Sequence, residues 1–298
     1  MKSDIKSWII KDLLSVSIGF LKDKNIESPR LSAEILLAHQ LKTDRLKLYL
    51  EYDQPVGVND LTRYRSMIKR LIDGEPLQYI TGIQEFWSMN FTVNSSVLIP
   101  RPETETLVEL ALRVYSEEYA DVHPDISVLD IGTGSGAIAI AVASELENAK
   151  ITATDISEAA LETAKLNASR HGMESRISFH KGDLFEPFER DHQYFDIIMS
   201  NPPYVTVEEY DLLPKKIKDY EPKLALESGE DGLSHISEIV EKAHGFLNPG
   251  GWLMLEIDHL QTDPVIQILK SNTEYHAGQV VKDYSNKNRV AVARKKES

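Results

Sequence analysis

The stretch VLDIGTGSGA, residues 128–137, decides the fold, because an apolar strand pattern runs here into a glycine-rich turn and then a helix. The glycines allow positive φ angles and let a ligand approach the backbone closely. The free N–H groups and positive dipole end of the following helix favour a carboxylate or another anionic group. The spacing is G-x-G-x-G, whereas dinucleotide-binding proteins typically have G-x-G-x-x-G. Taken alone, the turn is a weak signal, compatible also with a dinucleotide site or with a tight turn that binds nothing.

Downstream of this turn, strand and helix patterns alternate to the end of the chain. The predicted strands are residues 127–130, 151–155, 177–180, 195–200, 252–257, 279–283 and 290–293. The predicted helices are residues 137–146, 158–171, 233–246 and 264–271. Alternating units of this kind build a mostly parallel sheet covered by helices on both faces. No helix fits between the last two strands, so they should pair as an antiparallel hairpin. This pattern predicts an α/β fold of the seven-stranded, Rossmann-like class I methyltransferase type.

Two further segments precede the α/β domain, which we place at residues 103–298. Residues 1–75 carry apolar side chains at helical spacing and predict a small N-terminal helical domain of four or five helices. Within it, Pro29 suits the first turn of a helix, and Asn59 is expected to cap another. Residues 76–102 change to an extended pattern, which predicts a β-hairpin linker.

Composition excludes several classes of protein. The net charge of −14 repels a phosphate backbone and argues against tight non-specific binding of DNA or RNA. Without cysteine there are no disulfides, thiolate metal sites or cysteine nucleophiles, and the chain suits a reducing compartment. No stretch approaches the roughly 20 apolar residues that span a bilayer, and the start, MKSDIKSWIIKDLL, predicts a helix and not a signal peptide. We therefore expect a cytoplasmic protein without membrane contact, and the nine histidines show no metal-ligand spacing.

Acidic residues follow the second and third strands of the predicted sheet. Asp155 ends the second strand, where a carboxylate can accept hydrogen bonds from ribose hydroxyls. Its alternative role is the N-cap of the next helix. Asp183, after the third strand, is a candidate partner for an adenine amino group, with Leu184 beside the ring. A plain turn aspartate is the competing interpretation of Asp183.

The stretch IIMSNPPY, residues 197–204, is the most informative of the chain. Its apolar strand delivers Asn201 to the carboxyl end of the sheet, where open α/β folds bind ligands. Asn201 and Pro202 each precede a proline, so both are held extended. The prolines have no backbone N–H, so they add no competing donor beside the acceptors. We call residues 201–204 the ledge. It is expected to offer two acceptors, the side-chain oxygen of Asn201 and the carbonyl of Pro202, beside the flat ring of Tyr204.

Two acceptors suit a planar NH2 group, whose nitrogen is a poor nucleophile because its lone pair is conjugated. If both hydrogens are held, the nitrogen bends toward tetrahedral geometry and its lone pair is aimed at an electrophilic methyl group. Stabilisation that grows toward the transition state, together with fixed positioning, accelerates such a step. No general base is needed first, since the nitrogen can lose its proton after methylation. The competing interpretation is that Asn-Pro-Pro only ends a strand in a turn.

Five more motifs accompany the turn and the ledge. They are GEPLQYITG (74–82), EFW (85–87), IPRPETE (99–105), YEPKLAL (220–226) and DYSNKNR (283–289). Together with residues 130–136 and the ledge, they resemble the PrmC/HemK family, the N5-glutamine methyltransferases of class 1 peptide chain release factors, over nearly the whole chain. Two positions depart from the family pattern: Asp258 stands where glycine is usual, and Leu184 replaces a more usual aromatic residue, which weakens stacking there.

The resemblance implies S-adenosylmethionine as cofactor, S-adenosylhomocysteine as product, and the glutamine of the release factor's Gly-Gly-Gln loop as methyl acceptor. The expected cofactor-binding residues are Asp130, Gly132, Thr133, Gly134, Ser135, Gly136, Asp155, Asp183, Leu184 and Asn201. The expected catalytic residues are Asn201, Pro202 and Tyr204. The expected substrate-binding residues are Asn201, Pro202, Pro203 and Tyr204, with Arg101 and Glu103 as loop-shaping residues or a surface salt pair. The helical domain would recognise the rest of the release factor, and we expect a monomer with no direct contact to DNA.

Three alternatives stay open at this point. The first is a sister enzyme that methylates a glutamine of a ribosomal protein and shares the turn and the ledge. The second is an adenine-N6 methyltransferase of DNA or RNA, because the ledge can also hold the amino group of a flipped adenine. The acidic charge and the lack of room for a target-recognition domain argue against it. The third is a Rossmann-like binding module without catalysis, which an intact turn and ledge disfavour.

Overall fold

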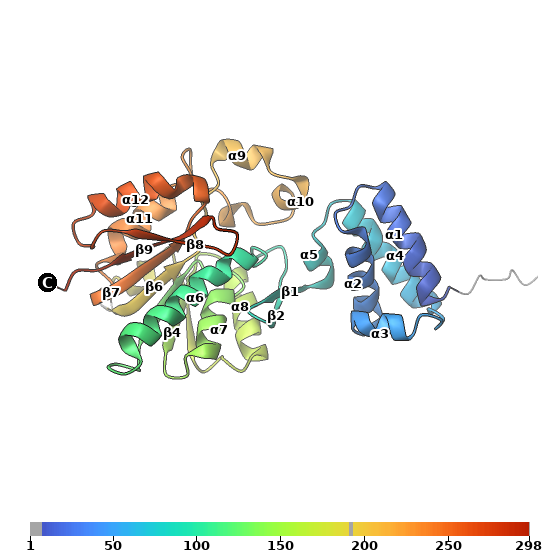
Figure 1. Ribbon diagram of the computed structural model, residues 1–298, viewed down its shortest axis with the longest axis horizontal. Helices are drawn as coiled ribbons and strands as arrows, with labels where there is room; N and C mark the ends of the chain where they lie inside the picture. Colours follow the sequence, from blue (N-terminus) through green and yellow to red (C-terminus); the bar gives the residue numbers. More distant parts are fainter. Residues whose placement is uncertain (1–7, 191–192, 298) are drawn as a thin grey trace, which may run out of the picture. The chain divides into compact units, whose positions relative to one another are not determined.

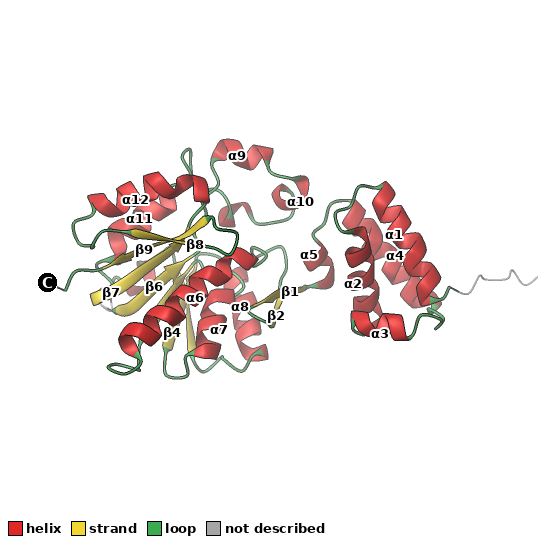
Figure 2. Ribbon diagram, viewed as in Figure 1, coloured by secondary structure: helices red, strands yellow, loops and turns green. Residues whose placement is uncertain are grey.

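The computed structural model describes residues 8–190 and 193–297, and the chain divides into two compact units (Figures 1 and 2). The helical unit extends to Gly82 and includes Lys215–Tyr220, whereas the sheet unit comprises Ile83–Pro214 and the chain from Glu221 onward. The division falls after residue 82 and not after residue 75, because part of the expected linker forms a helix. The part of the predicted first helix before residue 8 lies outside the described residues. Within the described ranges, no helix is long and apolar enough to cross a membrane.

The described part of the helical unit has a core of its own. Its helices are α1 (Ile10–Asp23), α2 (Pro29–Leu41), α3 (Arg45–Leu50), α4 (Val58–Ile72), α5 (Leu77–Thr81) and the short α10 (Lys215–Lys218). Leu36, Leu37 and Tyr64 are fully buried at its centre. Pro29 opens α2, as predicted. The prediction for Asn59 is wrong, because α4 begins at Val58, two residues earlier than a helix capped by Asn59 would, and Gly57 occupies the cap position without a side-chain bond.

The sheet unit is built on seven strands in the order β5-β4-β3-β6-β7-β9-β8. They are β3 (Ser127–Ile131), β4 (Lys150–Asp155), β5 (Ile177–Lys181), β6 (Phe195–Ser200), β7 (Leu247–Glu256), β8 (Gln279–Lys282) and β9 (Asn288–Arg294). Strands β3 to β7 pair in parallel, and β9 runs antiparallel to both β7 and β8. The predicted fold class and the closing hairpin are confirmed. A separate hairpin of β1 (Ile83–Phe86) and β2 (Met89–Thr92) precedes the sheet.

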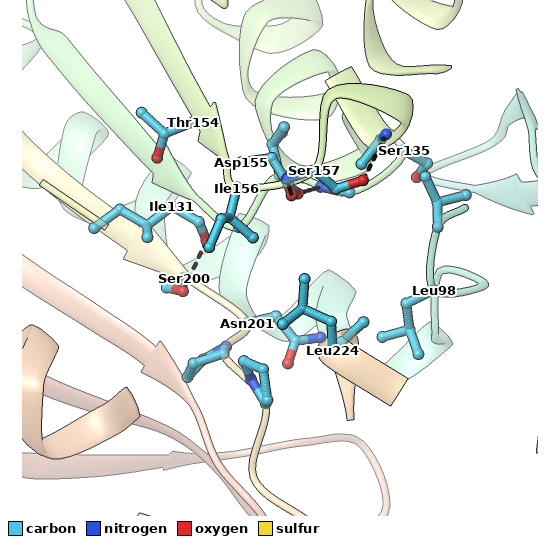
Figure 3. A pocket seen from close by; sticks show the side chains of 18 of the residues that line it. Leu98, Ile131, Ser135, Thr154, Asp155, Ile156, Ser157, Ser200, Asn201 and Leu224 are labelled. Atoms are coloured by element: carbon cyan, nitrogen blue, oxygen red, sulfur yellow. Dashed lines mark hydrogen bonds between the residues drawn. The ribbon is translucent and has the colours of Figure 1, made fainter. Parts of the chain in front are cut away.

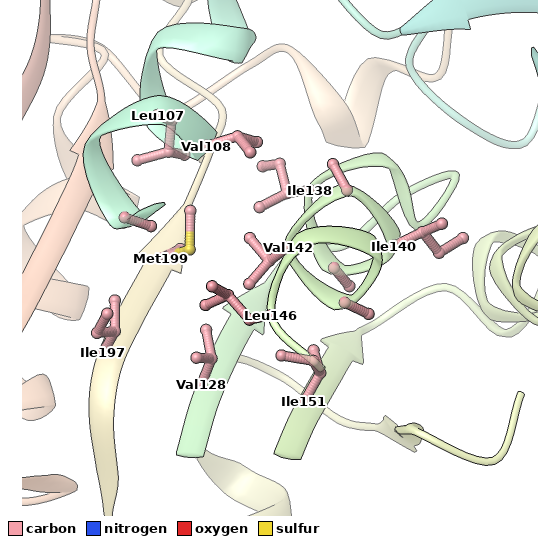
Figure 4. Close-up of a cluster of buried hydrophobic side chains, with 14 of the residues drawn as sticks. Leu107, Val108, Val128, Ile138, Ile140, Val142, Leu146, Ile151, Ile197 and Met199 are labelled. Carbon is pink, nitrogen blue, oxygen red and sulfur yellow. The ribbon is translucent and has the colours of Figure 1, made fainter. Parts of the chain in front are cut away.

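Helices cover both faces of the sheet. One face carries α6 (Glu105–Val114), α7 (Ala137–Glu145) and α8 (Glu158–Arg170), and the other carries α11 (Ser234–Ala243) and α12 (Thr262–Ser271). Figure 4 shows the first face, where Val108 of α6 and Val142 of α7 gather with Val128 and Met199 of the sheet. Burial of each such side chain stabilises the fold by roughly 1.5–3 kcal/mol. Helix α7 is buried along most of its length, which explains why its sequence is apolar on all sides.

The register of β3 brings the two decisive motifs together. Ile131 pairs with Ser200 of β6 on one side and with Thr154 of β4 on the other. The glycine-rich turn and the ledge therefore begin at the same edge of the sheet, on adjacent strands. On one side of β3 the sheet continues with β4 and then β5. The chain then returns to the other side of β3, where β6 and β7 lie. Ligands of open α/β sheets bind at such a reversal of strand order.

Asn167 of α8 ties the β1–β2 hairpin to the glycine-rich turn. Its side-chain oxygen accepts from the backbone N–H of Thr92 at 2.7 Å. Its amide nitrogen donates to the carbonyl of Thr92 at 3.0 Å and to the carbonyl of Ser135 at 2.8 Å. The side chain is fully buried. One amide thus satisfies three backbone groups, two of Thr92 and one of Ser135, from segments that lie far apart in the sequence.

Replacement of this amide is expected to destabilise the sheet unit. Asn167→Ala leaves three backbone groups without a partner, so we expect the free energy of unfolding to fall by about 3 kcal/mol. Urea denaturation measures the change. Ser169→Ala, at an exposed position of the same helix, is the matched control and should change stability by less than about 0.5 kcal/mol. Equal stabilities of the two variants would contradict the role given to Asn167.

Candidate active site

A cavity of about 380 Å³ opens where β3, β4 and β6 end. This volume lies within the range of roughly 300–1,000 Å³ typical of small-molecule sites. The lining comes from the turns after these strands, from the linker around Leu98 and from the segment around Leu224. Figure 3 shows Asp155 and Ser157 on one side of the cavity and Asn201 on the other. The structure thus brings most of the predicted site residues to one place.

The glycine-rich turn forms one wall of the cavity. Gly132, Gly134 and Gly136 have φ angles of 69°, 56° and 82°, which side chains other than glycine rarely adopt. A Cβ at Gly132 or Gly134 would meet no protein atom within 4 Å, so these residues border open space. A Cβ at Gly136 would lie 3.0 Å from Ile140 and 3.2 Å from Ala164. Gly136 does not line the cavity; it allows α7 and α8 to pack closely behind the turn.

Asp130 lies beneath the turn and not in the cavity lining. One of its carboxyl oxygens accepts from the hydroxyl of Thr133 at 2.6 Å and from the N–H of Ala139 at 3.2 Å. The other oxygen is buried without a hydrogen-bond partner. Burial raises the pKa of Asp130 to about 7, against the opposing hydrogen bonds. Among the expected cofactor-binding residues, Asp130 therefore holds the shape of the turn from behind.

Asp155 lines the cavity next to the turn. Its two oxygens accept from the N–H groups of Gly134 at 2.9 Å and Ser157 at 2.8 Å. Burial raises its pKa, while these two bonds act to lower it. The helix-cap alternative does not hold, because Ser157 caps α8 by accepting from the N–H of Ala160. Each oxygen of Asp155 keeps a second lone pair with which to accept from a ligand hydroxyl.

Asp183 and Leu184 both line the cavity. Asp183 is exposed, and its backbone N–H donates to Glu186 at 3.2 Å. Leu184 has a φ of 45°, a conformation that non-glycine residues seldom adopt. The strain at Leu184 persists because the residue packs against the buried cluster on the α11 face of the sheet. Its side chain offers an apolar contact and no aromatic stacking.

The ledge contributes three of its four residues to the cavity: Asn201, Pro202 and Pro203. The amide nitrogen of Asn201 donates to the hydroxyl oxygen of Thr104 at 3.3 Å, so its side-chain oxygen is the part left to accept from a ligand. Tyr204 is not among the lining residues. Its ring packs against the α11-side cluster, and its carbonyl accepts from the amide of Gln261 at 2.9 Å.

Arg101 and Glu103 do not line the cavity and do not pair with each other. Arg101 instead forms an ion pair with the buried carboxylate of Glu221 at 2.6 Å. Glu221 also accepts from the N–H of Ile99 at 3.2 Å, whereas Glu103 is exposed. The linker beside the cavity is thus held by Glu221 of the YEPKLAL motif.

Several lining residues were not predicted as site residues, among them Leu98, Thr104 and Leu224. Leu98 directly precedes the IPRPETE motif, Thr104 lies within it, and Leu224 belongs to the YEPKLAL motif. The only sequence feature that could have marked these residues as part of the site is their place in or next to these motifs. Asp258, which replaces the usual glycine, caps the 3-10 turn η5 (His259–Gln261) by accepting from the N–H of Leu260. Among the described residues, no group of three or more His, Asp or Glu could hold a metal ion.

Comparison with known proteins places the chain among methyltransferases. A family model of the PrmC N-terminal domain matches residues 12–82, and a methyltransferase domain model matches residues 122–296. The release factor glutamine methyltransferase of Geobacter sulfurreducens is 42% identical over 259 residues, which cover 87% of each chain. The protein of that name from Rhodopirellula baltica is 38% identical over 283 residues, 95% of each chain.

A solved structure, the human methyltransferase 10 domain containing protein, shares the fold at 15% identity. Its TM-score is 0.52, and the match covers 82% of this chain and all of that one. The two curated relatives match along almost their full length, in the helical unit as well as in the sheet unit. The chain therefore belongs to the family of release factor glutamine methyltransferases.

Proposed function

We propose that this enzyme transfers a methyl group from S-adenosylmethionine to the side-chain amide nitrogen, N5, of the glutamine in the Gly-Gly-Gln loop of class 1 peptide chain release factors. This modification tunes translation termination. Family membership supports the reaction. The observation that carries the proposal is the orientation of Asn201 at the wall of the cavity, with its amide nitrogen on Thr104 and its oxygen left as an acceptor.

The chemistry of an amide explains why acceptors are required. The nitrogen of a glutamine side chain is planar and weakly nucleophilic. Its two hydrogens are the groups through which hydrogen-bond acceptors can hold it. The oxygen of Asn201 and the carbonyl of Pro202 would each take one hydrogen, turning the lone pair out of conjugation. Because both residues precede a proline, the ledge is stiff before the substrate arrives. Positioning of this kind can contribute several kcal/mol to lowering the barrier.

The residues present fit the cofactor that the family uses. The open space in front of Gly132 and Gly134 gives room for a ligand to approach their backbone, and Asp155 keeps lone pairs for the ribose hydroxyls. Asp183 would face the adenine amino group, with Leu184 against the ring. When bound, S-adenosylmethionine supplies a methyl group on a positively charged sulfur. These roles are part of the proposal, as is a supporting role for Asp130 beneath the turn.

The substrate would be recognised in two steps. The ledge would hold only the glutamine side chain, and the helical unit would bind the body of the release factor. The chain would act as a monomer in the cytoplasm, where release factors work, without direct contact to DNA or to a membrane. The net charge of −14 supports the absence of nucleic-acid binding, since it repels phosphates.

A labelling experiment tests the substrate. With S-adenosylmethionine labelled in its methyl group, the enzyme is expected to label a class 1 release factor, and mass spectrometry should locate the label on the glutamine of the Gly-Gly-Gln loop. The matched control is the same release factor with that glutamine replaced by glutamate, which should remain unlabelled. Label on a ribosomal protein or on DNA, with none on the release factor, would contradict the proposal.

A second experiment tests the acceptor role of Asn201. In the Asn201→Ala variant kcat should fall at least about a hundredfold, because one of the two acceptors for the substrate amide hydrogens is lost. The affinity for S-adenosylhomocysteine, measured by calorimetry, should change only about twofold. The control is Asn272→Ala, the same substitution outside the cavity at the end of α12, which should keep its activity. Near-normal turnover by Asn201→Ala would exclude the role given to this residue.

A further inference from the structure

One histidine lines the cavity and takes no part in the proposed methyl transfer. His235 lies in the first turn of α11, and it is partly buried. Ile239, one turn further along the same helix, lines the cavity as well. Residues four apart lie on one face of a helix, so α11 turns this face toward the ligand space. A side chain with two ring nitrogens therefore stands on the cavity wall.

The ring of His235 is held by Ser228, which has no exposed surface. The hydroxyl oxygen of Ser228 lies 2.8 Å from Nδ1 of the ring and accepts from the backbone N–H of His235 at 3.1 Å. Ser228 is tied to the residue after the ledge, since its own N–H donates to the carbonyl of Val205 at 2.9 Å. Between Ser228 and His235, Gly232 lets the chain pass close to the ledge, because a Cβ there would collide with the carbonyl of Tyr204. The position of the ring is thus fixed relative to the ledge.

The hydrogen bonds of Ser228 decide which nitrogen of the ring carries the proton. A buried hydroxyl hydrogen needs an acceptor, and in the described part of the chain Nδ1 of His235 is the one acceptor within reach. Ser228 therefore donates to Nδ1, and in the neutral ring the single proton lies on Nε2. Within residues 8–190 and 193–297, Nε2 makes no hydrogen bond. The ring thus offers one N–H donor at the wall of the cavity.

The segment after β5 lies along α11 and borders the same part of the cavity. Leu184 packs against the buried cluster to which Ile239 belongs, and the next residue, Phe185, is a member of that cluster. The ring of Phe185 stacks on Phe246, which follows the far end of α11, with 4.7 Å between the ring centroids. Leu184 and Ile239 both line the cavity. His235, on the same face of α11 as Ile239, therefore faces the end of the cavity assigned to the adenine.

The edge of an adenine ring needs both kinds of hydrogen-bonding partner. Its amino group is a donor, and the flanking ring nitrogens N1 and N7 are acceptors. In the proposed function the carboxylate of Asp183 accepts from the amino group, but a carboxylate has no hydrogen to give to a ring nitrogen. Leu184 adds only an apolar side chain. The N–H of His235 supplies the side-chain donor that these two residues lack.

We propose that His235 is a cofactor-binding residue whose Nε2–H donates to a ring nitrogen of the adenine, N1 or N7. Ser228 is then a positioning residue, which holds the imidazole in the tautomer and orientation that this bond requires. The inference rests on the proposed function, in which the adenine lies beside Asp183 and Leu184. It concerns cofactor binding alone and does not depend on which group accepts the methyl.

The first test measures the Kd of S-adenosylhomocysteine by calorimetry, with no methyl acceptor present. His235→Phe keeps a flat ring but removes the donor, so Kd should rise about fivefold to tenfold. His235→Gln places an N–H near the position of Nε2 and should return Kd to within about twofold of wild type. The matched control is His244→Phe, the same change at the other end of α11 and outside the cavity lining, which should leave Kd unchanged. A wild-type Kd in His235→Phe, or no rescue by glutamine, would overturn the proposal.

The second test identifies the atom of the ligand. Two analogues of S-adenosylhomocysteine carry a C–H group in place of N1 or of N7. For one of them His235→Phe should no longer raise Kd, because variant and analogue remove the two ends of one bond. For the other analogue the full fivefold to tenfold rise should remain. If His235→Phe raised Kd equally for both analogues and for the natural ligand, the donor would not meet a ring nitrogen and the proposal would be wrong.

The third test concerns Ser228. Ser228→Ala should raise Kd about threefold when His235 is present and should change it little in the His235→Phe background, because the hydroxyl acts only through the imidazole. The same rise in both backgrounds would show a general structural effect and would refute the positioning role. These binding measurements also separate the inference from the proposed function. A release factor that stays unlabelled would refute the substrate only, whereas a Kd that is indifferent to His235 would refute this inference only.

Discussion

The parallel pairing of β3 with β6 is the constraint on which the rest of the site depends. Ile131 and Ser200 are register partners, so the residues that follow them leave the sheet side by side at the same edge. One strand continues into the glycine-rich turn, the other into the ledge. A slip of register would turn every side chain of a strand to the opposite face of the sheet, and the buried faces on both sides exclude it. The distance between the glycine-rich turn and the ledge is thus set by backbone hydrogen bonds.

Three buried polar side chains outside the cavity lining support the segments that form it. Asp130 holds the turn from beneath, Asn167 anchors the carbonyl of Ser135, and Glu221 holds the linker through Arg101. Such groups are costly to bury, and the hydrogen bonds that they form offset part of this cost. Their effect is to fix the lining in one geometry before any ligand binds. Enzymes that act by positioning depend on this kind of support, because misplacement by about 1 Å can cost about a hundredfold in rate.

Sequence patterns predicted the parts of this protein that are local. The seven strands, the closing hairpin and the meeting of the turn and the ledge follow from hydrophobic period, from Gly and Pro chemistry and from the rule that parallel strands end at one edge. Helix α5, assigned to a linker, is only five residues long, and α9 (Val207–Leu212) and α10 were missed for the same reason. The partners Arg101 and Glu221, and likewise Thr104 and Asn201, could not be paired from the sequence. Thr104 and Asn201 are 97 residues apart, and only tertiary packing joins them.

The ledge alone cannot decide the substrate. Two acceptors suit any planar NH2 group, whether it belongs to glutamine or to adenine. Selection must then come from surfaces that read the rest of the substrate. The segment after the ledge connects the two units: α9 begins with a capping box at Thr206 in the sheet unit, and residues 215–220, which follow α9, belong to the helical unit. There Lys216 pairs with Glu27 at 3.2 Å, and the hydroxyl of Tyr220 donates to the carbonyl of Asp73. The next residue is Glu221, which holds the linker beside the cavity. The helical unit is therefore joined to both the ledge and the linker through few residues of continuous chain.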